Sequence, residues 1–238
     1  MSAAASAKLL RPGLLEGVSI MLAHAGAAPA SGSPAPGSHV PPHASLREAL
    51  GESARVLAAG LRECPLPVEE EALAQRLSEE GTPDMLVVDA AGVFTAGGED
   101  AVAARDALGR TMRLTWEVTR TVAAAMIERE RPGRIVLVAP PERSGGAEAS
   151  SQAWSHAGAA RAGLENLART TSIEWSRYRI TTVAIAPGLA TPSETLAALC
   201  TYLASPAGAY FSGCVLALDG EVARAGGDGG AGGATSAS

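Results

Sequence analysis

Lysine, asparagine and tyrosine, three residue types that often serve in catalysis, are scarce in this sequence. Lys8 is the only lysine and Asn166 the only asparagine among 238 residues. The tyrosines come late in the chain, at Tyr178, Tyr202 and Tyr210. His39 and His43 lie four residues apart, but in a proline-rich stretch rather than on a helix face, so no metal site is expected. The cysteines, Cys64, Cys200 and Cys214, are odd in number and lack metal-ligand spacing, which favours buried free thiols in a reducing cytoplasm.

The overall composition is typical of a soluble globular protein. A net charge of −6 argues against nucleic-acid binding, which needs a basic face. No run reaches the roughly 18 consecutive apolar residues of a membrane span, and the N-terminus lacks the basic and apolar regions of a signal peptide. We therefore expect a cytoplasmic protein that binds neither nucleic acid nor a membrane.

Apolar runs of strand length alternate with longer helical patterns along the chain. Strands are predicted over 17–23, 55–61, 84–89, 134–139, 180–185 and 213–218, and helices from Ser45, over 68–80, 100–131, 157–175 and 193–203. Strands that are apolar along their whole length and alternate with helices indicate a parallel sheet covered on both faces. The predicted fold class is α/β, a doubly wound parallel sheet of the Rossmann type.

The predicted elements form a single domain over 14–224. Residues 1–13 are rich in alanine and serine and are expected to be a flexible leader. Residues 25–44 are a loop rich in proline and glycine, which no regular helix can accommodate. The glycine-rich tail over 225–238 is expected to be disordered.

The segment His156–Gly188 resembles the active-site helix and following strand of the short-chain dehydrogenase/reductase (SDR) family. Family members carry Tyr-x-x-x-Lys at the start of this helix, where the tyrosine is the general acid and the lysine lowers its pKa. The resemblance places Ala157 at the tyrosine position and Arg161 at the lysine position. Locally, the sequence is similar to dienoyl-CoA reductase-like and 3-oxoacyl reductase-like members. The chain thus resembles an SDR without its proton donor.

The other catalytic positions of the family are also substituted. The resemblance places Pro140 where the catalytic serine belongs and Thr111 at about the position of the catalytic asparagine. His156 and Ser144 are candidate substitutes for the missing acid and serine. A histidine at the start of a helix more often has no catalytic role, so His156 is not expected to replace the acid. With the four family positions substituted, the resemblance implies that the chain has no catalytic residues.

The nucleotide-binding loop of the family is altered as well. Family members have Thr-Gly-x-x-x-Gly-x-Gly after the first strand, where backbone N–H groups meet the cofactor pyrophosphate. Here Gly26 and Gly32 remain, Ala30 replaces the middle glycine, and Pro29 removes an N–H. Ala58, Ala59 and Gly60 occupy the region expected to carry the ribose-binding acid. We expect no cofactor.

Two shortened connections set the chain apart from the family. Too few residues separate the second strand from the strand at 84–89 for the usual helix, strand and helix, so one helix is expected to be missing. No room remains between Pro192 and Leu196 for the mobile substrate lid.

The helices 100–131 and 157–175 keep the family features best. In SDRs these helices form the four-helix interface of the dimer, and the closing strand contributes to a second interface. The resemblance therefore favours a non-catalytic subunit that joins a catalytically competent SDR paralogue in a heterodimer or heterotetramer through these helices. The alternative is a divergent but active NAD(P)-dependent reductase of a ketone or acyl-thioester.

Overall fold

The fold is an alternating series of strands and helices. The computed structural model describes residues 10–26, 46–96, 101–141 and 152–218. The strands are β1 (Ser19–Ala25), β2 (Gly60–Leu66), β3 (Met85–Asp89), β4 (Gly133–Val138), β5 (Ile180–Pro187) and β6 (Val215–Leu218). The helices are α2 (Leu46–Leu57), α3 (Glu70–Glu80), α4 (Ala90–Thr95), α5 (Ala101–Glu128), α6 (Gln152–Glu174) and α7 (Ser193–Ala204), with short 3-10 turns η2 (Ser176–Tyr178) and η3 (Pro206–Tyr210).

The strands form one parallel sheet in the order β2-β1-β3-β4-β5-β6. The chain moves outward from β1 to β2, then returns to β3 and proceeds in the other direction. The order therefore reverses between β1 and β3, and ligands of such sheets bind beyond the carboxyl ends of the strands at this switch point. The predicted doubly wound α/β fold is confirmed.

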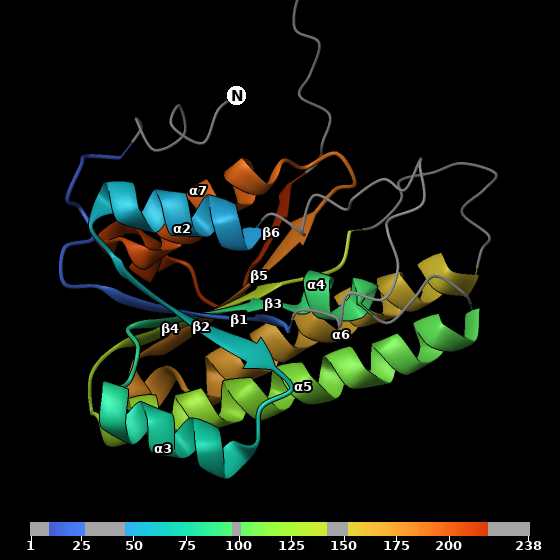
Figure 1. The fold of residues 1–238 in the computed structure, drawn as a ribbon, viewed down its shortest axis with the longest axis horizontal. Helices are drawn as coiled ribbons and strands as arrows, with labels where there is room; N and C mark the ends of the chain where they lie inside the picture. The colour runs from blue at the N-terminus through green and yellow to red at the C-terminus, as the bar shows by residue number, and fades with distance from the viewer. Residues whose placement is uncertain (1–9, 27–45, 97–100, 142–151, 219–238) are drawn as a thin grey trace, which may run out of the picture.

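Helices cover both faces of the sheet. Figure 1 shows α2 and α7 on one face and α3, α5 and α6 on the other. Alternate residues of each strand point to opposite faces. Thus Ile20, Leu22 and Val87 pack with α2 and α7, whereas Met21, Leu86 and Val88 pack with α3, α5 and α6. Both faces are closed by Leu, Val, Ile and Ala side chains, with few aromatic ones.

The predicted strand over 55–61 is wrong. Residues 55–57 complete α2, whose buried residues recur at helical spacing, and the helix ends where Ala58 adopts a φ of 61°. The second strand is β2, from Gly60 to Leu66. The short apolar run around Leu57 is ambiguous between a helix end and a strand, because periodicity needs a longer window.

The two connections predicted to be short are short. Between β2 and β3 the chain forms only α3, so a strand is absent there as well as one helix. Gly81, with a φ of 85°, ends α3 as predicted. At the other side of the sheet, five residues, Gly188–Pro192, join β5 to α7, which leaves no room for a lid.

Several sequence predictions fall on residues that the structure does not describe. These include the first nine residues of the leader, most of the loop over 25–44, the Ser45 helix cap and the tail over 225–238. None of the described helices is both long enough and apolar enough to cross a membrane.

Asp84 ties together the amino ends of three neighbouring strands. One of its carboxylate oxygens accepts the Ser19 N–H at 2.9 Å, and the other lies 3.0 Å from the Arg129 guanidinium that follows α5. Arg129 also donates to the carbonyls of Thr82 and Pro132 at 3.0 Å. The side chains of Asp84 and Arg129 are 28% and 16% exposed, so solvent screens this pair less than a surface pair.

Replacing Asp84 by alanine should destabilise the fold. Asp84→Ala leaves the Ser19 N–H without its side-chain acceptor and the largely buried Arg129 charge without its carboxylate partner, at a cost of about 2 kcal/mol. Urea unfolding followed by circular dichroism measures this change. Glu52→Ala is the control, because Glu52 forms an exposed pair with Arg55 and its loss should cost below about 0.5 kcal/mol. Equal costs for the two variants would contradict the role given to Asp84.

Candidate active site

The residues predicted to replace the catalytic groups lie on α5, on α6 and at the carboxyl ends of β4 and β5. Ala157, on α6, is 3% exposed and belongs to an apolar cluster between the two long helices. The other buried members of that cluster are Phe94, Ala104, Ala107 and Ala160. A methyl group in an apolar cluster can neither donate a proton nor bind a carbonyl oxygen. The position of the expected acid is therefore filled by packing.

Arg161 lies one helical turn after Ala157 and reaches the carboxyl end of β5. Its guanidinium donates to the Pro187 carbonyl at 3.2 Å and to the Glu165 carboxylate at 3.3 Å. The Arg161 side chain is only 16% exposed. Two of its donors are thus engaged within the protein, and its planar fork does not have the geometry of a lysine ammonium.

The turn after β5 holds a threonine whose hydroxyl is also engaged. Thr191 is 2% exposed, and its Oγ1 accepts the Gly188 N–H at 2.9 Å and donates to the Leu218 carbonyl at 3.1 Å. The Gly188 N–H also contacts that carbonyl, at 2.8 Å. This network closes the end of β5 onto the end of β6.

Thr111 and Pro140 occupy the remaining two catalytic positions. Thr111 lies on α5, is fully buried, and its hydroxyl has no hydrogen-bond partner among the described residues. Pro140 follows β4 and is buried; proline has no side-chain donor and no N–H. Pro140 therefore cannot polarise a carbonyl as a serine would, and the Thr111 hydroxyl is buried within the fold. Of the two candidate substitutes, His156 is partly buried on α6, whereas Ser144 lies outside the described residues.

Only the first residue of the altered nucleotide loop is described. The Gly26 N–H donates to the Leu66 carbonyl at 3.1 Å, so it continues the ladder between β1 and β2. Ala30 and Gly32 lie outside the described residues. Arg161 and Thr191, near the carboxyl end of β5, are both hydrogen-bonded within the protein.

The sequence analysis looked for the ribose-binding acid at residues 58–60, which it took to follow the second strand. Ala58–Gly60 precede β2 rather than follow it. The residues that do follow β2 include Glu69, Glu70 and Glu71, at the start of α3. Carboxylates are therefore present after the second strand, although Glu70 pairs with Arg120 on α5 at 2.5 Å.

Asp89 is a buried carboxyl group at the carboxyl end of β3, beside the switch point. It is 5% exposed, and its Oδ1 accepts the Gly92 N–H at 2.9 Å, which caps α4. Burial raises the pKa of Asp89 to about 7, only partly opposed by that hydrogen bond. The sequence analysis did not identify Asp89 as a titrating group.

A second polar group at this edge was missed entirely by the sequence analysis. His24, on β1, is 9% exposed; its Nδ1 lies 2.7 Å from the Ala25 carbonyl, so Nδ1 carries a proton. Its Nε2 lies 3.5 Å from the Glu63 carboxylate of β2, and Glu63 accepts from Arg47 of α2 at 2.7 Å. The hydrogen bond from Arg47 is the main cause that lowers the pKa of Glu63. The contacts among His24, Glu63 and Arg47 thus link β1, β2 and the first turn of α2.

The cysteines and acidic residues give no sign of nucleophilic or metal chemistry. Burial, with the nearby Asp89 charge, raises the pKa of Cys200 to about 12, and burial raises the pKa values of Cys64 and Cys214. Thiols of this kind are poor nucleophiles. Within the described ranges, no three His, Cys, Asp or Glu residues gather in a way that could hold a metal ion.

The raised pKa of Asp89 predicts a dependence of stability on pH. Because the folded protein holds this proton more tightly than the unfolded chain, stability should fall as pH rises from about 4 to about 7, by up to about 4 kcal/mol. Asp89→Asn keeps an acceptor for the Gly92 N–H and cannot ionise. Urea unfolding between pH 5 and pH 8 should therefore show the variant gaining stability over the wild type as pH rises. The exposed Asp106→Asn variant is the control; if Asp89→Asn runs parallel to the wild type, the carboxyl group is not protonated in the fold.

Comparison with known proteins agrees with this architecture. The short chain dehydrogenase family matches residues 47–199, more than half of the chain. No curated protein matches the sequence. A citronellol catabolism dehydrogenase of Pseudomonas aeruginosa has a similar structure, with a TM-score of 0.60 and 22% identity over 90% of this chain and 98% of that one.

Two further solved structures show the same arrangement of strands and helices. A Burkholderia xenovorans protein assigned to the short-chain dehydrogenases/reductases has a TM-score of 0.61 at 16% identity, over 87% of this chain and 97% of that one. An Escherichia coli K-12 protein assigned as an oxidoreductase has a TM-score of 0.58 at 19% identity, over 85% and 94%. At these identities the structures establish the fold alone, whereas the family match establishes descent: the chain belongs to the short-chain dehydrogenase family.

Proposed function

We propose that this protein is a non-catalytic subunit that assembles with a catalytically competent SDR paralogue in a heteromeric oxidoreductase. The observation that carries the proposal is the apolar packing at Ala157. There the position of the general acid is filled by a methyl group among alanine side chains and Phe94. The engaged Arg161 and Thr191 support the same conclusion, since both are held by backbone carbonyls rather than directed at a ligand.

The outer face of α5 and α6 supports assembly with another subunit. Trp116 on α5 is 43% exposed and Ile173 on α6 is 76% exposed, although large apolar side chains are otherwise mostly buried in the described residues. On α6 the neighbouring exposed positions, Ala159 and Ala162, are small and allow another helix to approach closely. Trp116 and Ile173 are therefore the apolar side chains of these two helices that a neighbouring subunit would cover.

The isolated chain should not bind a nicotinamide cofactor. We expect no change in NADPH fluorescence on titration with protein up to concentrations of about 0.5 mM, which corresponds to a free energy of binding weaker than about −4.5 kcal/mol. A catalytically competent SDR titrated in the same buffer is the positive control. Micromolar binding, or oxidation of NADPH with a ketone or acyl-thioester, would sink the proposal and support the divergent reductase instead.

A charge on the outer face of α6 should separate the subunits. Ala162→Glu introduces a carboxylate at an exposed position, and burying it unpaired in an interface costs several kcal/mol, on the order of 3–5. Gly163 is less suitable, because a Cβ there would lie 3.0 Å from Met112 within the same chain.

The measurement is co-purification of the tagged chain with an SDR from its own cells that retains Tyr-x-x-x-Lys, together with the NADPH-dependent activity of that partner. Ala162→Glu should lose the partner, and the activity should fall with it. Ala72→Glu, an equal change on the exposed side of α3, should leave both intact. A wild-type chain that remains monomeric beside the intact SDR contradicts the proposed function.

A further inference from the structure

The exposed side of α5 carries a stripe of arginines around one tryptophan. Arg105, Gly109, Arg113, Trp116 and Arg120 are all exposed and recur at spacings of three or four residues, or multiples of these, so they share one side of the helix. We refer to these five residues as the α5 stripe. It runs about 22 Å along the helix. A cationic stripe is unexpected on a chain whose net charge is −6.

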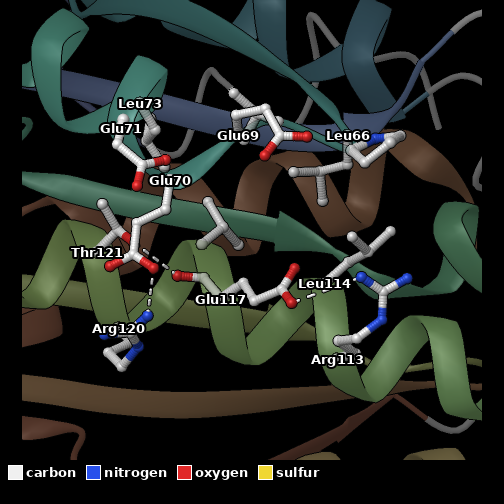
Figure 2. A pocket seen from close by; sticks show the side chains of 13 residues that line it. Leu66, Glu69, Glu70, Glu71, Leu73, Arg113, Leu114, Glu117, Arg120 and Thr121 are labelled. Carbon is white, nitrogen blue, oxygen red and sulfur yellow. Dashed lines mark hydrogen bonds and ion pairs between the residues drawn. The ribbon is translucent and has the colours of Figure 1, made fainter.

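The charges of the α5 stripe are only weakly neutralised within the protein. Figure 2 shows Arg113 beside Glu117 and Arg120 beside Glu70, at the edge of the groove between α3 and α5. These pairs join side chains that are 41–63% exposed, and exposed ion pairs of this kind contribute little. Arg105 has no ion-pair partner in the described part of the chain. A carboxylate of a partner could therefore pair with Arg105 directly, and could compete with the exposed Glu117 and Glu70 for Arg113 and Arg120.

The shape of the α5 stripe suits an antiparallel helix of the same form. A two-fold axis perpendicular to α5 repeats one surface on both copies and sets their α5 helices antiparallel. Centred between residues 112 and 113, such a contact places Trp116 of each copy opposite Gly109 of the other. An added Cβ at Gly109 would meet nothing within 4 Å, so the backbone there is an open notch for a bulky ring.

The charge of the α5 stripe opposes pairing with a second copy of this chain. In the same register Arg105 lies opposite Arg120, and Arg113 lies beside the Arg113 of the other copy, offset by one residue. Like charges placed opposite each other in an interface cost several kcal/mol. Shape therefore favours a helix built like α5, and charge excludes an identical one.

We propose that the α5 stripe selects a partner of the same fold whose matching helix carries carboxylates at the positions that face Arg105, Arg113 and Arg120. This inference rests on the proposed function and specifies its partner: a paralogue with an acidic stripe and a small residue opposite Trp116. Self-association is disfavoured by the same charges, which makes the assembly heteromeric.

The inference can be tested without knowing the partner, by making an acidic copy of this chain. The triple variant Arg105→Glu/Arg113→Glu/Arg120→Glu supplies carboxylates at all three facing positions. In sedimentation velocity at about 25 mM NaCl, wild type and variant should each remain monomeric, whereas their mixture should form a 1:1 complex at least about 100-fold tighter than either self-association. Raising NaCl to about 300 mM should weaken the mixed complex, because exposed charges are screened.

Two variants separate the α5 stripe from a general effect of charge. Arg11→Glu/Arg131→Glu/Arg177→Glu changes the net charge equally at exposed arginines elsewhere, and its mixture with wild type should stay monomeric. Trp116→Ala in the wild-type partner should weaken the mixed complex at least about tenfold, as loss of a central aromatic anchor does.

A wild-type chain that dimerises at micromolar concentration on its own, or a mixture that does not associate, overturns the inference. Binding of a single-stranded oligonucleotide that the acidic triple variant loses would overturn it in favour of a nucleic-acid site. Neither result bears on NADPH binding by the isolated chain, so failure here is distinguishable from failure of the proposed function.

Discussion

The close contact between α5 and α6 is the constraint on which the site and the assembly surface both depend. Small side chains at Ala104, Ala107, Ala157 and Ala160 let the helices approach, and Met112 lies against the backbone of Gly163. Interiors are packed densely enough that a side chain the size of tyrosine at position 157 would force the helices apart. The packing that joins these helices thus excludes the expected general acid. It also fixes which residues of α5 and α6 face outward.

Much of the fold could be predicted from the sequence because its elements are long and strongly patterned. The helix predicted over 100–131 is α5, and the strand predicted over 180–185 lies within β5. Prediction was wrong where the pattern was short, as at residues 55–57, which finish α2 rather than begin a strand. That error moved the apparent end of the second strand and hid the carboxylates of Glu69–Glu71 that follow it. A boundary error of a few residues in an α/β fold changes which side chains reach the carboxyl edge, and with it the prediction of a site.

At the candidate site, the expectation that no catalytic group is present rests on residue type alone. An alanine or a proline side chain cannot supply a proton in any geometry. The expectation at positions 157 and 140 therefore needs only the sequence. The environments of Asp89 and His24 were not predictable, because a raised pKa depends on burial and a histidine pair depends on which strands are neighbours. His24 meets Glu63 only because β1 and β2 pair in a register that places these side chains on one face, and Arg47 joins them from α2. Such contacts link segments far apart in the chain.

In the proposed non-catalytic subunit, the two sides of α5 and α6 are under different constraints. Toward the sheet, α5 and α6 need only fill space, so apolar and small residues suffice where an enzyme needs a tyrosine, a lysine and an asparagine. Toward solvent, a homodimer needs a surface that matches itself, whereas a subunit of a mixed assembly needs one that matches a different chain. Arginines that face arginines in a two-fold contact oppose a homodimer, but they are compatible with a mixed assembly whose other subunit carries carboxylates. In the proposed assembly, the exposed charge on α5 therefore specifies the partner more closely than the substituted positions on the inner side of the helices do.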